Sequence, residues 1–132
     1  MAKIFFGIIF FIFTLSGCAK ADFTIQNKAA KVLITNPQWG KFSISANLYP
    51  GENTGTTTFY KGSDYLGEFT IKFHMSAKNN GVYLETADKY SLYLEESKIF
   101  IIDDNTKVIN PVLVRSKNNF ITINEIVKDL SE

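Results

Sequence analysis

The sequence contains few residues of the kinds that hold small folds together covalently or through metals. Among its 132 residues there is one cysteine, one histidine and one tryptophan. A lone cysteine has no partner for an internal disulfide, and a structural zinc site needs four Cys or His ligands. A hydrophobic core must therefore stabilise the fold, which a chain of this size can build. We predict no cofactor and no metal site.

An excess of charge of either sign is also absent. The chain has 14 basic and 13 acidic side chains, so its formal net charge is +1. Nucleic-acid binding requires a basic patch or stripe, and binding of anionic lipid through charge alone requires a cluster of basic residues. The composition favours neither, and we predict no nucleic-acid partner.

The N-terminus has the pattern of a secretory signal peptide. Lys3 is followed by an apolar run of about a dozen residues and then by small residues, which is typical of such leaders. A helix that crosses a bilayer needs about 20 residues, so this run is too short to be a membrane anchor. The run ends in Leu15-Ser16-Gly17-Cys18. This tetrad resembles the lipobox of bacterial lipoproteins, in which the cysteine is lipidated and becomes the first residue of the mature chain.

The resemblance implies a lipid anchor and a division of the chain. Residues 1–17 would be the cleaved signal peptide, and Cys18 the lipidated residue of a mature chain of 115 residues. One acyl chain binds a membrane only marginally, but lipoproteins carry two or three, such as palmitate, on that cysteine. Position 19 is alanine rather than the aspartate that retains such proteins in the inner membrane of enterobacteria, so we expect the outer membrane. We predict a tether over residues 18–22 and a single β-rich domain over residues 23–132, unless folding begins only at Lys31.

Alternation of apolar and polar residues predicts that the domain is built from strands. Residues 42–48 and 69–75 alternate with a period of two, as half-buried strands do. Further strands are expected at residues 31–35, 56–60, 82–85, 91–95, 98–102, 112–115 and 120–123. The run Ile99-Phe100-Ile101-Ile102 has no polar side, which predicts a central strand covered on both faces.

Turn signals separate these strands. Asn80-Gly81 predicts a tight hairpin after the strand that ends near Ala77. At the C-terminus, the spacing of Ile123, Ile126, Val127 and Leu130 places one apolar stripe on a helix, and Thr122 with Glu125 has the spacing of a capping box. The predicted fold is therefore all-β, an antiparallel β-sandwich or small barrel with a short C-terminal helix.

The sequence offers little catalytic chemistry. His74 lies on the polar side of a predicted strand, where it is a solvent-facing residue or, alternatively, a general base. There is no Gly-x-Ser-x-Gly elbow to activate a serine. Glu95 and Glu96 would point to opposite faces of a strand, and residues 103–105 are interpreted as a turn rather than a calcium loop, which needs more ligands. We predict that the protein is not an enzyme.

Aromatic side chains near loops are the best indication of a binding surface. Trp39 lies within the predicted loop of residues 36–40, and Tyr49, Tyr60 and Tyr65 flank the two loops that follow. Tryptophan and tyrosine dominate the energetics of protein interfaces. We therefore predict that Trp39, Tyr49, Tyr60 and Tyr65 form a partner-binding surface, unless Trp39 packs over the edge of the core and the tyrosines merely end strands.

These observations predict a membrane-anchored lipoprotein of the bacterial cell envelope that acts as a non-catalytic, protein-binding or assembly module. Its partners would be the lipid bilayer, through acylated Cys18, and a protein of the envelope. An immunity, inhibitor or exclusion lipoprotein, which neutralises a toxin, a lysozyme-like enzyme or a phage, is the alternative. A hydrolase is the third class.

Overall fold

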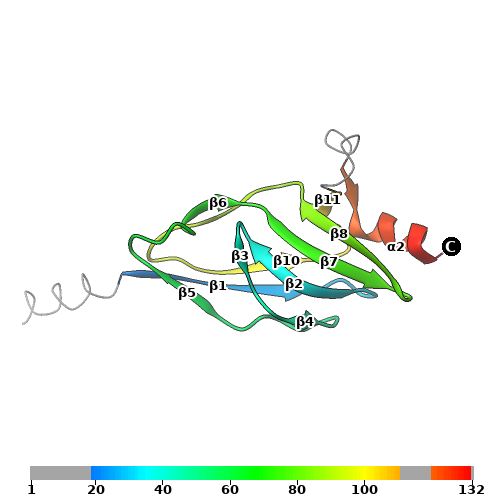
Figure 1. The fold of residues 1–132 in the computed structure, drawn as a ribbon, viewed down its shortest axis with the longest axis horizontal. Coiled ribbons are helices and arrows are strands. Elements are labelled where there is room, and N and C mark those ends of the chain that lie inside the picture. Colours follow the sequence, from blue (N-terminus) through cyan, green and yellow to red (C-terminus); the bar gives the residue numbers. More distant parts are fainter. Residues whose placement is uncertain (1–18, 111–119, 132) are drawn as a thin grey trace, which may run out of the picture.

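The computed structural model describes residues 19–110 and 120–131. The predicted leader, Cys18 and the predicted strand at residues 112–115 lie outside the described residues. The described chain is a sandwich of antiparallel and mixed β-sheets with one short helix, α2, at its C-terminal end (Figure 1). These sheets are not closed into a barrel, so of the two predicted architectures the β-sandwich with a short C-terminal helix is confirmed.

Three sheets make up the sandwich. The small sheet has the order β10-β1-β5, the large sheet has the order β12-β11-β8-β7-β2-β3 with β4 also paired to β2, and β6 pairs with β9. The strand bounds are β1 (Lys20–Asn27), β2 (Leu33–Trp39), β3 (Phe42–Ser43), β4 (Asn47–Leu48), β5 (Thr57–Tyr60), β6 (Gly67–Phe69), β7 (Ile71–Ala77), β8 (Asn80–Thr86), β9 (Tyr90–Leu92), β10 (Ser97–Ile102), β11 (Lys107–Ile109) and β12 (Ile121–Thr122).

Strand β1 begins the fold earlier than the sequence suggested. It starts at Lys20, and Ala21 is already fully buried. Its inward positions, occupied by Ala21, Phe23 and Ile25, alternate with half-buried polar residues, as the pleat of a strand requires. Neither predicted start of the fold, residue 23 or Lys31, is therefore correct. Of the tether predicted over residues 18–22, Lys20, Ala21 and Asp22 belong to β1.

A β-bulge in β2 changes which residues face the core. The register against β7 shifts between Thr35 and Gln38, and Asn36 has a φ of 48°. One extra residue reverses the alternation, so Ile34 and Trp39 both point inward although five positions separate them. The prediction of a loop at residues 36–40 is therefore wrong for most of its length, because β2 continues to Trp39.

The strand predicted at residues 42–48 is divided by the same bulge. Its two ends, β3 and β4, both pair with β2, and residues 44–46 between them follow the bulge. Backbone hydrogen bonds from Ile44 N to Pro37 O, at 2.9 Å, and from Asn36 N to Ala46 O, at 2.8 Å, fasten this stretch. The predicted alternation is confirmed, since even-numbered residues face inward and odd-numbered ones outward.

Strands β7 and β8 form the predicted hairpin, but the turn falls earlier. Ala77 pairs with Asn80, and the two residues with positive φ are Lys78 and Asn79, at 49° and 70°. Two consecutive positive φ angles are the signature of a type I′ turn. This register keeps Ile71, Phe73, Met75 and Ala77 on the core side, whereas a slip of one residue would expose a strand's whole apolar set.

Strand β10 is an edge strand and not the predicted central one. Among the described residues it pairs with β1 alone, in parallel. Phe100 and Ile102 on its inner face are buried, but Ile99 and Ile101 are 63% and 40% exposed, so its outer face is uncovered. The prediction of a strand covered on both faces is therefore wrong.

The C-terminal helix α2 (Ile123–Ser131) is confirmed. Ile123, Ile126 and Val127 are buried against the rest of the core. The hydroxyl of Thr122 accepts a hydrogen bond from Glu125 N at 3.3 Å and lies 3.1 Å from the Glu125 carboxylate, so it caps the helix as the spacing predicted. Helix α2 and the start of β1 lie at opposite ends of the molecule (Figure 1).

Candidate functional site

Trp39 is a core residue. Its side chain has no exposed surface, its ring stacks on Phe100 with centroids 5.0 Å apart, and its indole Nε1 donates a 2.8 Å hydrogen bond to the carbonyl oxygen of Tyr65. A side chain in this position cannot contact a partner of the folded protein. The prediction of Trp39 as a partner-binding residue is therefore wrong, and the alternative of core packing is correct. The bulge in β2 is the physical cause.

Two of the predicted tyrosines do lie together. Tyr60 and Tyr65 line a hollow of about 490 Å³ with Phe42, Phe59 and Lys61, which we call the aromatic hollow. Tyr65 is half-buried and its ring lies 5.3 Å from the centroids of both Phe42 and Phe59, whereas Tyr60 is 63% exposed at the rim. The bond from Trp39 to the Tyr65 carbonyl fixes the loop behind this hollow.

Tyr49 is separate from this group. It follows β4, its backbone N–H bonds to the Glu52 carboxylate at 2.9 Å, and its side chain is 58% exposed. The adjoining turn bonds to the end of β1, since Gly51 N donates to Asn27 O at 2.6 Å. Tyr60, in contrast, pairs with Lys20 at the start of β1. Tyr49 and Tyr60 therefore lie beside opposite ends of β1.

Hydrogen bonds tie the start of β1 to its surroundings on both sides. On one side Lys61 N donates to Ala19 O at 3.4 Å, next to the Lys20–Tyr60 pair. On the other side Glu95 N donates to Lys20 O at 2.7 Å. The residue that follows Cys18 is therefore already bound to the folded domain, close to the aromatic hollow.

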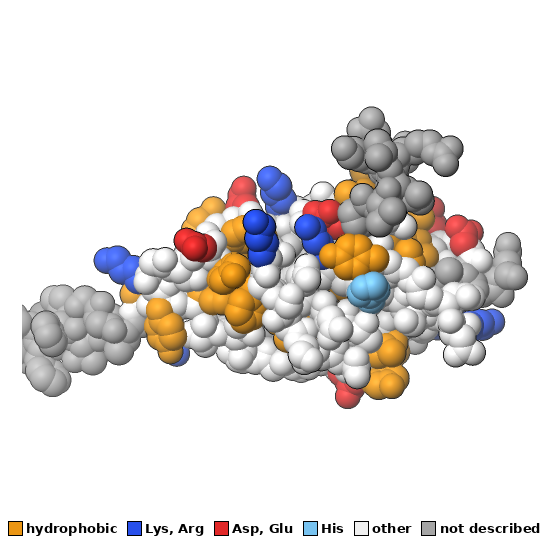
Figure 2. Space-filling model, in the orientation of Figure 1, with side chains coloured by type: hydrophobic (Ala, Val, Ile, Leu, Met, Phe, Trp, Pro, Cys, Tyr) orange, Lys and Arg blue, Asp and Glu red, His pale blue; other side chains and the backbone are white. Residues whose placement is uncertain are grey.

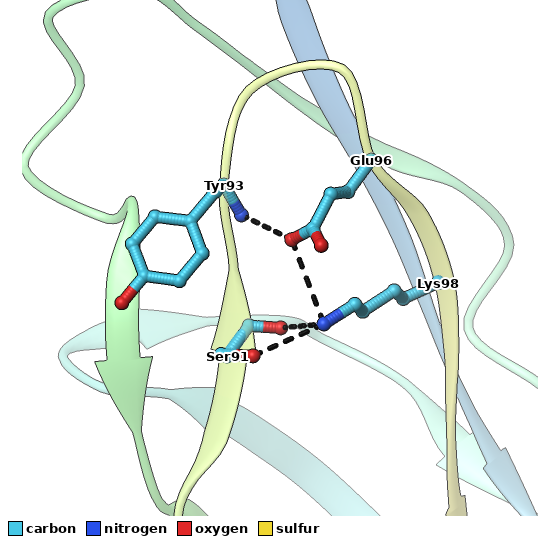
Figure 3. Close-up of polar contacts among 4 residues, drawn as sticks. All are labelled: Ser91, Tyr93, Glu96 and Lys98. Atoms are coloured by element: carbon cyan, nitrogen blue, oxygen red, sulfur yellow. Dashed lines mark hydrogen bonds and ion pairs between the residues drawn. The ribbon is translucent and has the colours of Figure 1, made fainter.

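The turn at residues 93–96 is held by a lysine (Figure 3). The Nζ of Lys98 donates to the carbonyl and hydroxyl oxygens of Ser91 at 2.8 and 3.0 Å, and lies 3.5 Å from the Glu96 carboxylate. The same carboxylate accepts a 2.7 Å bond from Tyr93 N. Glu95 and Glu96 thus belong to a turn and not to the predicted strand, and Glu96 has a structural role.

His74 is exposed on the outer face of β7, as predicted. Its ring packs on Tyr83 of β8 with centroids 4.9 Å apart, and both line a hollow of about 420 Å³ with Ser43 and Ser45. Within the described part of the chain, no hydrogen bond joins His74 to a serine or to a carboxylate. The described contacts thus do not prepare it as a general base.

A further hollow of about 590 Å³ carries both signs of charge. Lys41, Lys72 and Lys89 share it with the carboxylates of Asp64, Glu68 and Glu85. Basic and acidic side chains are interspersed on this face of the molecule, and hydrophobic ones form small groups among them (Figure 2). Balanced charges give no preference for an anion or a cation.

Asp103, Asp104 and Asn105 form the predicted turn. The Asp103 carboxylate accepts hydrogen bonds from Asn105 N at 2.9 Å and from the Thr106 hydroxyl at 3.2 Å. The Asp104 carboxylate accepts one from Ala30 N at 3.3 Å. No group of three or more His, Cys, Asp or Glu side chains among residues 19–110 and 120–131 is arranged so that it could hold a metal ion.

The pKa of Tyr90 is shifted by its surroundings. Its half-buried ring packs on Phe100 with centroids 5.3 Å apart. Burial raises the pKa of its hydroxyl above the ordinary value of 10.0, and the carboxylates of Asp88 and Asp103 raise it further. A hydroxyl with a raised pKa stays protonated at neutral pH, so this shift does not make Tyr90 a base there.

Sequence reasoning missed the exposed pair on β10. Ile99 and Ile101 point away from the core beside Thr24 and Gln26 of β1, on the outer face of the small sheet. A run of four apolar residues does not reveal whether one face or both faces of its strand are covered. No sequence signal for this surface was available without the pairing of β10 to β1.

Comparison with protein-family models, with curated proteins and with solved structures gives no match. None of the described helices has the length and apolar character that a membrane span requires.

Proposed function

We propose that this chain is a lipoprotein of the bacterial cell envelope, anchored by acylated Cys18, whose β-sandwich is a non-catalytic module for binding or assembly with a protein partner. The start of the fold supports the proposal most directly. In the sequence, the Leu15-Ser16-Gly17-Cys18 tetrad is separated from β1 by Ala19 alone, and Ala21, three residues after Cys18, is already in the core. Cleavage before Cys18 would leave β1 and the rest of the domain intact, with the lipid attached close to the start of β1.

The exposed pair on β10 supports the binding part of the proposal. These two isoleucines lie on the outer face of one strand, where they add nothing to the core and are available for contact with a partner. The partner would pack on Ile99 and Ile101 across the outer face of the small sheet. With alanine at position 19, we propose the outer membrane as the location.

Affinity capture from cross-linked envelopes tests this function. The full lipoprotein is the bait, Cys18→Ser is the unanchored control, and a double variant with Ile99→Thr and Ile101→Thr removes the apolar pair while retaining β-branched residues. We expect one partner with the full lipoprotein and a several-fold loss with the double variant. Capture unchanged by the double variant would remove β10 from the interface.

The partner's identity separates the two candidate functions. An envelope protein captured from the same cell would support assembly. Capture of an externally added lytic enzyme, together with protection of a sensitive cell that expresses only this chain, would instead support the immunity or inhibitor function.

A further inference from the structure

We propose that the aromatic hollow rests on the bilayer, with Tyr60 in the lipid headgroup region, and so fixes the orientation of the domain on the membrane. This inference rests on the proposed acylation of Cys18. It assigns Tyr60 and Tyr65 to lipid contact and leaves the rest of the surface for protein partners.

The first argument is the shortness of the linker. Only Ala19 separates Cys18 from Lys20, the first residue of β1. Two residue steps span at most about 7 Å. The attachment point of the lipid is therefore held within about 7 Å of the folded domain, and the end of the domain at Lys20 must lie against the membrane surface.

The second argument is the place of the aromatic hollow at that end. Tyr60 is the register partner of Lys20, and partners on antiparallel strands lie about 5 Å apart. The next residue, Lys61, bonds to Ala19. Both Tyr60 and Lys61 line the aromatic hollow, which therefore opens beside the lipid anchor.

The third argument is chemical. Tyrosine is enriched at the membrane–water interface, where its ring meets the acyl boundary and its hydroxyl stays in water. Lys61 can lay its methylene stem along the lipid while its ammonium group remains hydrated. Phe42 and Phe59 add apolar surface to the hollow. The Lys20 ammonium group lies 3.9 Å from the Asp22 carboxylate, which offsets its charge, so we expect the contact to depend on aromatic rings more than on charge.

A protein partner fits this position poorly. A helix has a diameter of about 10 Å with its side chains. A partner helix seated in the aromatic hollow would have to fit between the bilayer and an end of the domain that the linker holds within about 7 Å of the lipid attachment point. The surface of the bilayer can contact the hollow without the space that a helix would need.

The bound orientation presents the opposite end to partners. The seven residue steps of β1 raise its far end by about 23 Å. Tyr49, Ala30 and helix α2 lie toward that end (Figure 1). The far end of the sandwich would then project from the membrane.

Fluorescence quenching by lipid tests the inference on the full lipoprotein. The lipoprotein is placed in vesicles of phosphatidylethanolamine and phosphatidylglycerol that contain a lipid with a nitroxide near its headgroup. Lipidated Cys18 has no thiol, so one introduced cysteine takes the fluorophore, either at Lys61→Cys or, as the matched exposed control, at Ala30→Cys. We expect the label at position 61 to be quenched several-fold more than the label at position 30, in low and in high salt.

A second pair of variants tests the aromatic hollow itself. On the Lys61→Cys background, Tyr60→Asp should lower the quenching several-fold, whereas Tyr49→Asp, which changes an equally exposed tyrosine at the other end, should leave it unchanged. Trp39 emission reports whether each variant is folded. Quenching that survives Tyr60→Asp in a folded protein would overturn the assignment, as would quenching abolished by salt.

Flotation with the vesicles separates this inference from the proposed function. A parent protein that does not float is not acylated, which overturns both. A protein that floats but shows equal quenching at positions 61 and 30 retains its anchor and overturns this inference alone, leaving the aromatic hollow open to a protein.

Discussion

Asn27 is expected to be the most sensitive polar residue of the fold. It is fully buried at the end of β1, and its side-chain amide donates hydrogen bonds to Val32 O at 2.9 Å and to Leu48 O at 2.8 Å. Its side-chain oxygen accepts one from Ala29 N at 2.9 Å. One side chain thus joins β1 of the small sheet to β4 of the large sheet and to the segment before β2.

Asn27→Ala removes all three of these buried hydrogen bonds. At about 1–1.5 kcal/mol for each lost partner, the free energy of unfolding should fall by about 3–4.5 kcal/mol. That is a large share of the roughly 5–15 kcal/mol of a typical domain, and it should lower the melting temperature by more than about 10 °C. Asn27→Asp keeps the shape but turns a carboxylate oxygen toward two carbonyls, so a comparable loss is expected at neutral pH.

Urea unfolding of the soluble Cys18→Ser form measures these losses, with the buried Trp39 as the fluorescent probe. Asn53→Ala is the matched control, because Asn53 is exposed and its side chain accepts a single hydrogen bond, from Gly55 N. The control should cost less than about 0.5 kcal/mol. If Asn27→Ala and Asn27→Asp both stay within 1 kcal/mol of the parent protein, water satisfies these groups and the reasoning is refuted.

Three further stability predictions concern buried or half-buried side chains. Trp39→Ala should cost about 3–5 kcal/mol in urea unfolding followed by circular dichroism, and a loss under 1 kcal/mol would contradict its core position. Thr86 accepts a hydrogen bond from Ile71 N and donates one to Asp88 O. Thr86→Val should therefore lower the free energy of unfolding by about 1–3 kcal/mol, and Thr86→Ser should lower it much less. Equal losses would show that the methyl group matters more than the hydroxyl. Because the folded state raises the pKa of Tyr90, the contribution of its protonated hydroxyl to stability is complete below pH 10 and is lost as pH rises through the folded-state pKa. Tyr90→Phe should weaken this alkaline loss of stability in urea unfolding, and an unchanged loss would assign it to other groups.

The sequence predicted well what depends on local alternation. The inward residues of β7 and the even-numbered residues 42–48 are on the expected sides, because side-chain direction alternates along any strand. The stripe of α2 follows equally from its period. These are properties of the chain over a few residues, and the fold class follows from them.

Features set by distant pairing could not be predicted. The side of Trp39 depends on a bulge that appears only when β2 pairs with β7. Ile99 is exposed because the outer face of the small sheet is uncovered at that point, and the partner of its strand in that sheet, β1, lies more than 70 positions earlier in the chain. Strand β11, only three residues long, was not predicted because its pairing with β8 and β12 is what defines it.

The candidate site was predicted in part for the same reason. Tyr60 and Tyr65 are near one another in sequence and border one loop, so their proximity follows from the loop. Tyr49 also follows a strand, but the hydrogen bond between Gly51 and Asn27 places its turn at the far end of β1. Loop neighbours in sequence share a surface only if their strands run to the same end of the sheet.

The most direct test of the proposed anchor is the intact mass of the protein extracted from membranes. We expect a chain of 115 residues that begins at Cys18, with a mass increase that matches two or three acyl chains. An unmodified Cys18, or a chain that begins at another residue, would contradict the lipoprotein assignment.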